Sequence, residues 1–243
     1  MTEQFPPHDL ECPEPTECTV AVDALTQLAQ SGDLATATFS TERAWYRVYD
    51  AREGFGSANP GFGNTRFAPF DDLRAGRRIP TMYLADTLAA ALLETSFHDV
   101  HLLQPRVVSE LALHGSLHAQ LLPPQPLTVV DLRDDQLDAL GLSRENLASS
   151  SYEHYPCTRR VAQAIHASEN QSEGIVWNSR QAELSGKTGH EVMVLFADRV
   201  APGRDAWSLG KNRSANGSLL EGAGRELLDE IAESLTVTII KDL

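Results

Sequence analysis

The chain has 243 residues, 42% of them hydrophobic and 22% charged, which suits one large soluble domain with a substantial buried core. Its formal net charge of −14 argues against sequence-independent binding to DNA or RNA, because such binding depends on Lys and Arg contacts to phosphate. The same charge favours a basic protein partner, although solubility alone also explains it.

Residues 1–40 are predicted to form an N-terminal extension. Residues 1–18 are rich in Pro, Glu and Cys, which is typical of an extended tail. A valine and two leucines then recur among alanines at helical spacing, which predicts a short amphipathic helix from Thr19 to about Gln30. Ser31-Gly32 would end it.

Strands and helices are mixed over residues 41–243 without regular βαβ alternation, so we expect an α+β fold rather than a doubly wound sheet. The glycine-rich run 54–64 is predicted to be a loop, as is the polar segment 202–217. Predicted strands cover 44–49, 81–84, 106–114, 127–132, 174–177, 190–196 and 236–240. Predicted helices begin after Asp86 or Thr87 and cover 134–140, 158–167 and 219–235.

Several common signatures are missing. The three cysteines, at 12, 18 and 157, are too few for a disulfide framework and fit no zinc spacing, and Cys157 is interpreted as a core thiol. The histidine pairs at 98/101 and 114/118 lack a third ligand in pattern, so no metal is expected. There is no P-loop and no Gly-x-Ser-x-Gly elbow. Neither a signal peptide nor a membrane span is visible, which favours a reduced, cytoplasmic protein.

The most informative stretch runs from Arg47 to Glu94. It places Arg47, Arg66, Tyr83 and Glu94 on short elements joined by the glycine-rich loop. Arginine binds phosphate through two parallel hydrogen bonds, an aromatic ring can hold a flat ring, and a carboxylate can stabilise a cationic sugar transition state. These residue types together favour a pocket for an anionic ligand that carries a ribose.

Each of these residues alone has a plainer interpretation. Either arginine can form a structural salt bridge, Glu94 can face solvent at the end of a helix, and Tyr83 can belong to the core. Ser179, which follows a buried strand, can cap a turn. The functional hypothesis therefore depends on the residues as a set.

As a set, the chain resembles the RES-domain family, the toxins of RES–Xre type II toxin–antitoxin systems. The strongest resemblance covers residues 45–196. Two features depart from the usual pattern: Ala68 stands where an asparagine is common, and the stretch 71–80 is longer. The matching segments are Tyr46-Arg47-Val48, Arg66-Phe67-Ala68-Pro69, Tyr83-Leu84-Ala85, Ala91-Leu92-Leu93-Glu94 and Gly174-Ile175-Val176-Trp177-Asn178-Ser179-Arg180.

The resemblance implies a fold like that of ADP-ribosyltransferases, with a split mixed sheet and flanking helices. It also implies cleavage of the nicotinamide–ribose bond of NAD, with water or inorganic phosphate as acceptor. NAD is then a substrate and not a cofactor. Glu94 would stabilise the developing charge on the ribose, and Arg47 and Arg66 would bind the pyrophosphate. Tyr83 would bracket the nicotinamide ribose, and Ser179 would orient the ribose or the carboxylate.

The resemblance further implies an Xre-like antitoxin as partner, which would carry the DNA contact, with no direct contact between this chain and nucleic acid. No membrane partner is expected, because no apolar stretch is long enough to span a membrane. A homo-oligomer or a toxin–antitoxin hetero-oligomer both remain open. So do two other functions on the same fold: transfer of ADP-ribose to a protein or nucleic acid, and an inactive module that only binds a partner. A metal-dependent hydrolase that uses the histidines is a weaker alternative.

Overall fold

The computed structural model describes residues 10–98, 100–103, 105–147, 152–201, 206–212 and 214–241. The helices in this part of the chain are α1 (Val22–Ser31), α2 (Leu88–Leu93), α3 (Asp134–Ala139), α4 (Tyr155–Ala167), α5 (Arg180–Leu184) and α6 (Gly222–Ser234). The strands are β1 (Thr36–Phe39), β2 (Trp45–Asp50), β3 (Thr81–Ala85), β4 (Val107–Ser109), β5 (Ser116–Leu122), β6 (Leu127–Asp131), β7 (Gly174–Asn178), β8 (Glu191–Phe196), β9 (Ser208–Leu209), β10 (Asn216–Ser218) and β11 (Thr238–Ile240).

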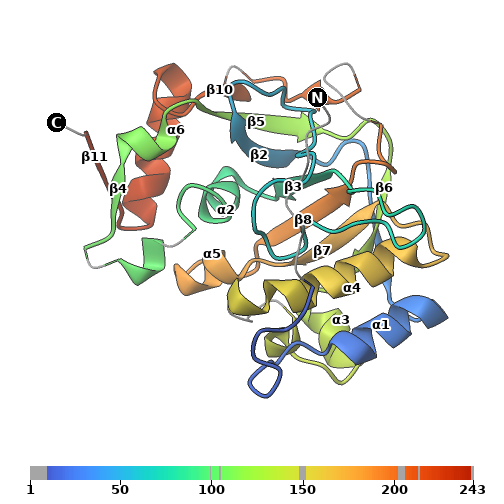
Figure 1. The fold of residues 1–243 in the computed structure, drawn as a ribbon. Helices are drawn as coiled ribbons and strands as arrows, with labels where there is room; N and C mark the ends of the chain where they lie inside the picture. Colours follow the sequence, from blue (N-terminus) through green and yellow to red (C-terminus); the bar gives the residue numbers. More distant parts are fainter. Residues whose placement is uncertain are drawn as a thin grey trace.

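Nine of these strands form one mixed sheet in the order β1-β6-β7-β8-β3-β2-β5-β10, with β9 paired to β5 (Figure 1). Strands β6 and β7 are parallel, and the other described pairs of this sheet are antiparallel. Strands β4 and β11 form a separate parallel pair. The predicted α+β class is confirmed.

The sheet opens between β2 and β3. Strand β2 pairs with β5 along its whole length, and β3 does the same with β8. Within the described strands, β2 and β3 meet at a single pair, Tyr46 with Ala85. The two strands diverge from that point, so their facing edges leave room for a cavity inside the sheet. This agrees with the split mixed sheet that the resemblance implies.

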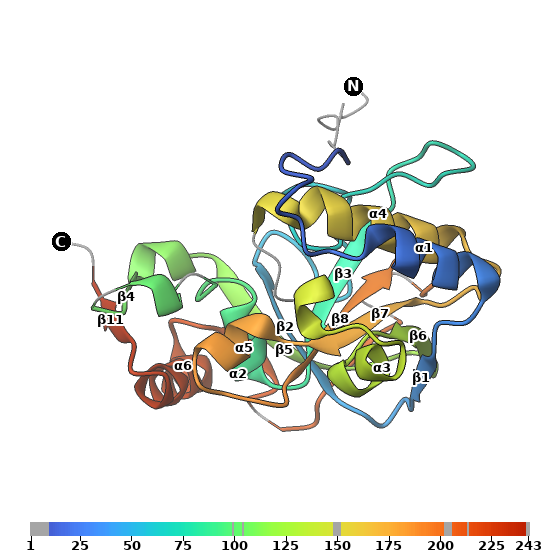
Figure 2. The ribbon, with the colours of Figure 1, turned by 90° about the horizontal axis from the view of Figure 1, so that it is seen from below.

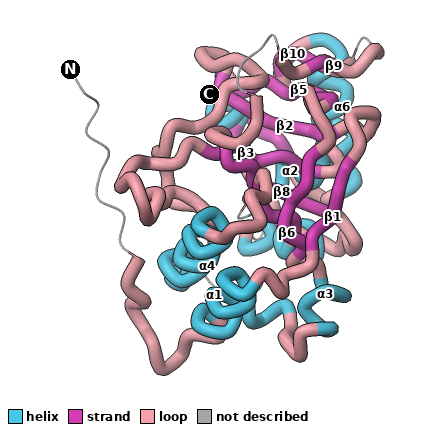
Figure 3. Tube along the Cα trace, turned by 90° about the vertical axis from the view of Figure 1, so that its right-hand side faces the viewer, coloured by secondary structure: helices cyan, strands magenta, loops and turns pink. Residues whose placement is uncertain are grey.

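Side chains alternate between the two faces of the sheet, as the pleat of a strand requires. On β8, Val192, Val194 and Phe196 belong to one core cluster, whereas Met193 and Leu195 belong to another. Helices α1 and α4 pack against each other and cover the first face (Figures 2 and 3). Burial of these apolar faces is the main force that holds the helices on the sheet.

A third core cluster joins α2, α6 and the β4–β11 pair at one end of the molecule (Figure 1). Helix α2 contributes to two of the three clusters, through Ala90 and Ala91 on one side and Leu88, Leu92 and Leu93 on the other. All of its residues except Ala89 are therefore buried. This burial fixes the position of the residue that follows it, Glu94.

Most predicted elements lie within one to three residues of their observed ends. The strand predicted over 106–114 is wrong beyond β4, because the Ser109 hydroxyl accepts from Leu111 N (3.0 Å) and a 3₁₀ turn follows at Glu110–Leu113. Part of the predicted loop 202–217 is instead β9 and β10, and its residues 202–205 and 213 lie outside the described chain, as do residues 1–9 of the tail. The predicted division at residue 40 stays a prediction.

Among the described residues, no helix combines the length and the apolar character that crossing a membrane requires.

Candidate functional site

A cavity of about 240 Å³ occupies the split in the sheet. Its walls come from β2 and β3, from the end of α2, and from the loop after β2. Pockets that enclose a drug-sized ligand have volumes of about 300–1,000 Å³, so this cavity lies just below that range. Its lining residues are Tyr46, Arg47, Val48, Tyr49, Asp50, Glu53, Asn59, Thr81, Tyr83, Leu84, Ala85, Ala91, Glu94, Thr95 and Val192.

Arg47 provides a buried cation in the cavity wall. It lies on β2, and its Nη1 donates to Phe55 O (2.7 Å) and Ser57 O (2.6 Å) in the glycine-rich loop. Its Nη2 forms a long ion pair with the Glu53 carboxylate, at 3.9 Å, which is beyond hydrogen-bonding distance. Burial lowers the pKa of Arg47 to about 10, against the opposing effects of Glu53 and Tyr49. The guanidinium therefore stays charged at neutral pH.

Tyr83 lies on β3 and ties the cavity wall to the loop 65–68. Its hydroxyl lies 2.8 Å from Thr65 Oγ1 and accepts from Phe67 N at 3.1 Å. Its ring packs edge-on against Trp177, with ring centroids 6.0 Å apart. Burial raises the pKa of Tyr83 to about 12. Its hydroxyl is thus neutral at physiological pH and serves to fix the ring.

Glu94 and Ser179 are joined by a short hydrogen bond at the site. Glu94 caps the C-terminus of α2, and Ser179 caps the N-terminus of α5, where its hydroxyl accepts from Ala182 N at 3.0 Å. The same hydroxyl donates to Glu94 Oε1 at 2.6 Å. A hydrogen bond to an ionised carboxylate is stronger than one between neutral groups and fixes its orientation. One carboxylate oxygen is thus held by Ser179 on the cavity wall.

Arg66 does not belong to the described lining of the cavity. It is buried on the loop that the Tyr83 hydroxyl holds, where its Nη1 donates to Leu147 O (3.1 Å) and its guanidinium faces the Tyr155 ring at 5.1 Å. Burial lowers the pKa of Arg66, and Tyr155 and Glu94 act in the opposite direction. Arg66 therefore adds positive charge near Glu94 from behind the wall.

The structure thus gathers Arg47, Tyr83 and Glu94 at one cavity and attaches Ser179 to it through Glu94. Sequence reasoning did not single out Asn59 and Thr81, although both line the cavity and their backbones exchange hydrogen bonds of 2.8 and 2.9 Å. The glycine-rich loop was the signal that could have indicated Asn59, because a loop beside a strand of the site can close over it.

Among the described residues, no histidine lines this cavity. His98 contacts Gln181 through its Nε2 at 2.9 Å, and the side chain of His101 lies outside the described part of the chain. His114 is exposed at the end of a 3₁₀ turn, and His118 is buried on β5, so these two do not share a helix face.

Comparison with known proteins defines the class of this chain. The family model of the RES domain matches residues 42–209. The chain therefore belongs to the RES-domain family. No curated protein matches the sequence.

A chain of the M. tuberculosis MbcT–MbcA toxin–antitoxin complex has a similar fold, with a TM-score of 0.57 and 17% sequence identity. The match covers 88% of this chain and 100% of the other. At this identity the likeness concerns the fold alone, and it supports the predicted α+β fold.

Proposed function

We propose that this chain is the toxin of a toxin–antitoxin pair and that it cleaves the nicotinamide–ribose bond of NAD. The observation that carries the proposal is the Glu94 carboxylate, which Ser179 holds at 2.6 Å on the wall of the cavity. The buried cation Arg47, on β2, lines the same cavity. Membership of the RES family and the fold shared with a chain of a toxin–antitoxin complex support it.

The reaction needs little acid catalysis. The nicotinamide ring of NAD is already cationic, so when its bond to the ribose C1″ breaks it takes the bonding electrons and leaves as a neutral molecule. Positive charge then develops on the ribose, and Glu94 stabilises that charge electrostatically. A water molecule or a phosphate oxygen forms the new bond to C1″; when water attacks, it releases a proton.

The remaining residues position the substrate. The cavity volume of about 240 Å³ suits the nicotinamide riboside half, with the pyrophosphate at the mouth near Arg47. Tyr83 brackets the ribose with a ring that its hydrogen bonds keep in place. Arg66 reinforces the positive potential for the pyrophosphate from its buried position. Holding the reacting groups in this way lowers the entropic part of the barrier.

An enzyme that destroys NAD requires control by a partner. We assign that role to an Xre-like antitoxin that covers the cavity mouth, and the net charge of −14 suits a partner with a basic surface. The antitoxin, and not this chain, would then contact DNA.

The test is NAD consumption by the purified chain without antitoxin, with and without inorganic phosphate, read by mass spectrometry. We expect nicotinamide release, with ADP-ribose or its 1″-phosphate identifying the acceptor. The Glu94→Gln variant should be slower by on the order of 10²–10³-fold. Glu233→Gln, the same change at an exposed position on α6, serves as the matched control.

Three outcomes would redirect the proposal. Full turnover by Glu94→Gln would remove Glu94 from the mechanism. If the wild-type chain alone leaves NAD intact in both buffers, but consumes it when a protein or nucleic acid is added and ADP-ribose appears on that target, the chain is a transferase. If neither reaction occurs, it is a module that only binds its partner.

A further inference from the structure

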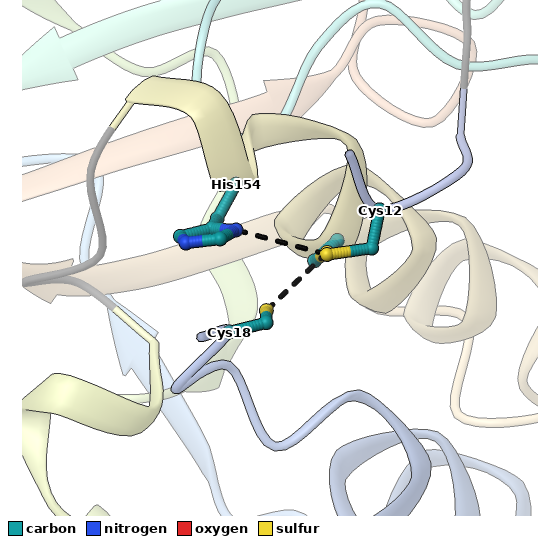
Figure 4. Close-up of side chains that lie close together, drawn as sticks. Cys12, Cys18 and His154 are labelled. Atoms are coloured by element: carbon teal, nitrogen blue, oxygen red, sulfur yellow. Dashed lines mark hydrogen bonds between the residues drawn. The ribbon is translucent and has the colours of Figure 1, made fainter. Parts of the chain in front are cut away.

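The three cysteines of the chain meet one histidine where the N-terminal segment crosses the start of α4. Cys12 and Cys18 come from the segment before α1, and His154 and Cys157 flank the first residues of α4. Figure 4 shows Cys12, Cys18 and His154 converging from separate stretches of backbone. The ligand atoms of all four residues lie within 4.8 Å of one another.

The spacing of these atoms matches a tetrahedral metal site. With Zn–S bonds of about 2.3 Å and Zn–N bonds of about 2.0–2.1 Å, tetrahedral angles place two sulfurs about 3.8 Å apart and a sulfur and a nitrogen about 3.6 Å apart. The observed distances are 3.5 Å from Cys18 Sγ to Cys157 Sγ and 3.7 Å from Cys12 Sγ to His154 Nδ1. A cation at the centre needs only small side-chain adjustments.

A disulfide does not account for the cluster. The sulfurs of a disulfide are about 2.05 Å apart, and all three cysteines are free thiols. A disulfide would also use two sulfurs and leave the third thiol and the imidazole without a reason to converge. Three sulfurs and one imidazole nitrogen are the soft donor set that selects Zn²⁺ over hard cations such as Mg²⁺ or Ca²⁺.

We propose that Cys12, Cys18, His154 and Cys157 bind one structural Zn²⁺. Four protein ligands close the coordination sphere, so no position is left for a substrate, which distinguishes a structural from a catalytic zinc. None of the four residues belongs to the described lining of the cavity in the sheet. The proposal therefore stands independently of the proposed NAD chemistry, and it departs from the expectation of no metal drawn from sequence spacing.

The zinc would fasten the N-terminal segment to the support of the cavity wall. Residues next to the ligands on α4 contact the Arg66 loop: the Tyr155 ring faces the Arg66 guanidinium at 5.1 Å, and the Thr158 hydroxyl donates to the Arg66 carbonyl. The metal thus joins two segments 139 residues apart in sequence and stabilises the start of α4, which holds that loop.

The test uses the full chain purified under reducing conditions from cells supplied with zinc. We expect one zinc per chain by mass-spectrometric metal analysis. Replacement by Co²⁺ should give the sulfur-to-cobalt charge-transfer absorption and the intense visible bands of a tetrahedral thiolate site. Cys12→Ser and His154→Gln should lose the metal, whereas His114→Gln, at an exposed histidine, should keep it. Removal of the metal by a chelator should lower the melting temperature of the wild-type chain.

The proposal is overturned if the reduced, zinc-supplied chain holds no metal and Co²⁺ produces no charge-transfer band. It is also overturned if a Cys18–Cys157 disulfide is the stable state of the protein in the cell. Non-reducing mass spectrometry would show that disulfide as the loss of two hydrogens. These readouts concern the wild-type chain, so they decide the matter even if a variant fails to fold. A chain that binds zinc but leaves NAD intact would refute only the proposed function.

Discussion

Replacing Ser179 by alanine removes two interactions of one hydroxyl group. The hydroxyl accepts from Ala182 N at the start of α5 and donates to Glu94 Oε1 at 2.6 Å. Loss of an N-cap costs about 1 kcal/mol of stability. Since 1 kcal/mol shifts the melting temperature of a chain of this size by roughly 2–4 °C, the Ser179→Ala variant should melt a few degrees lower.

The effect on NAD turnover should be larger than the effect on stability. A hydrogen bond to a charged group contributes about 1.5–3 kcal/mol. If that bond holds Glu94 in its productive orientation, its loss slows turnover by roughly 10- to 150-fold, at 1.36 kcal/mol for each factor of ten. The assay is nicotinamide release at saturating NAD, paired with thermal unfolding of the same preparation.

Ser179→Gly separates the two interactions. Glycine at an N-cap costs only a few tenths of a kcal/mol, so this variant should be more stable than Ser179→Ala while its turnover falls equally. Wild-type turnover by Ser179→Gly would refute the positioning role and leave Ser179 as a helix cap. The positioning role would also be refuted if turnover fell in Ser179→Ala but fell less in Ser179→Gly, in step with the smaller loss of stability in that variant.

Three further predictions test neighbouring features of the molecule. Tyr83→Phe keeps the ring but leaves the Phe67 amide without its acceptor, so unfolding in urea should show a loss of about 1–3 kcal/mol. Burial acts to raise the pKa of Asp198, but the contact of His166 with its carboxylate at 3.0 Å outweighs burial and lowers the pKa. The ionised carboxylate therefore stabilises the fold above the unfolded-state pKa, and this contribution is lost as the pH falls through the folded-state pKa. Urea unfolding at pH 7 and pH 3 should show a smaller pH effect on stability in Asp198→Asn than in wild type. Gly174→Ala drives a methyl group into a carbonyl of β8 and should lower the stability of the fold by about 1–3 kcal/mol, so that soluble yield and melting temperature both fall. An unchanged melting temperature would contradict the close packing of β7 on β8.

The parts of the fold that local sequence determines were predictable. Strands β7 and β8 are short apolar runs bounded by polar residues, and α4 shows helical periodicity, so each signal lies inside the element. Strand β5 was missed because its sequence, Ser116 to Leu122, mixes His and Gln with apolar residues. Its extended state depends on pairing with β2 on one side and β9 and β10 on the other, which is tertiary context.

The candidate site, like the fold, could be predicted from the sequence only in part. The residue types indicated an anionic, ribose-bearing ligand, but the sequence did not distinguish the two arginines. The fold places Arg47 on the diverging edge of β2 and Arg66 on a loop packed against α4. The contact between Glu94 and Ser179 spans 85 residues and depends on the neighbouring order of β3, β8 and β7, which no local pattern encodes.

The burial of Arg47 is itself an argument for a ligand. A pKa lowered from 12.5 to about 10 means that folding opposes the charged form by roughly 3 kcal/mol, because each pKa unit corresponds to about 1.4 kcal/mol. The Phe55 and Ser57 carbonyls hold the guanidinium in position, and Glu53 forms a long ion pair with it at 3.9 Å. Among the described residues no carboxylate pairs with Arg47 at closer range, and a buried cation whose anion is so distant is unfavourable for stability alone. An anionic ligand in the cavity would supply a closer anion, which explains why a chain of net charge −14 keeps a positive charge at this position.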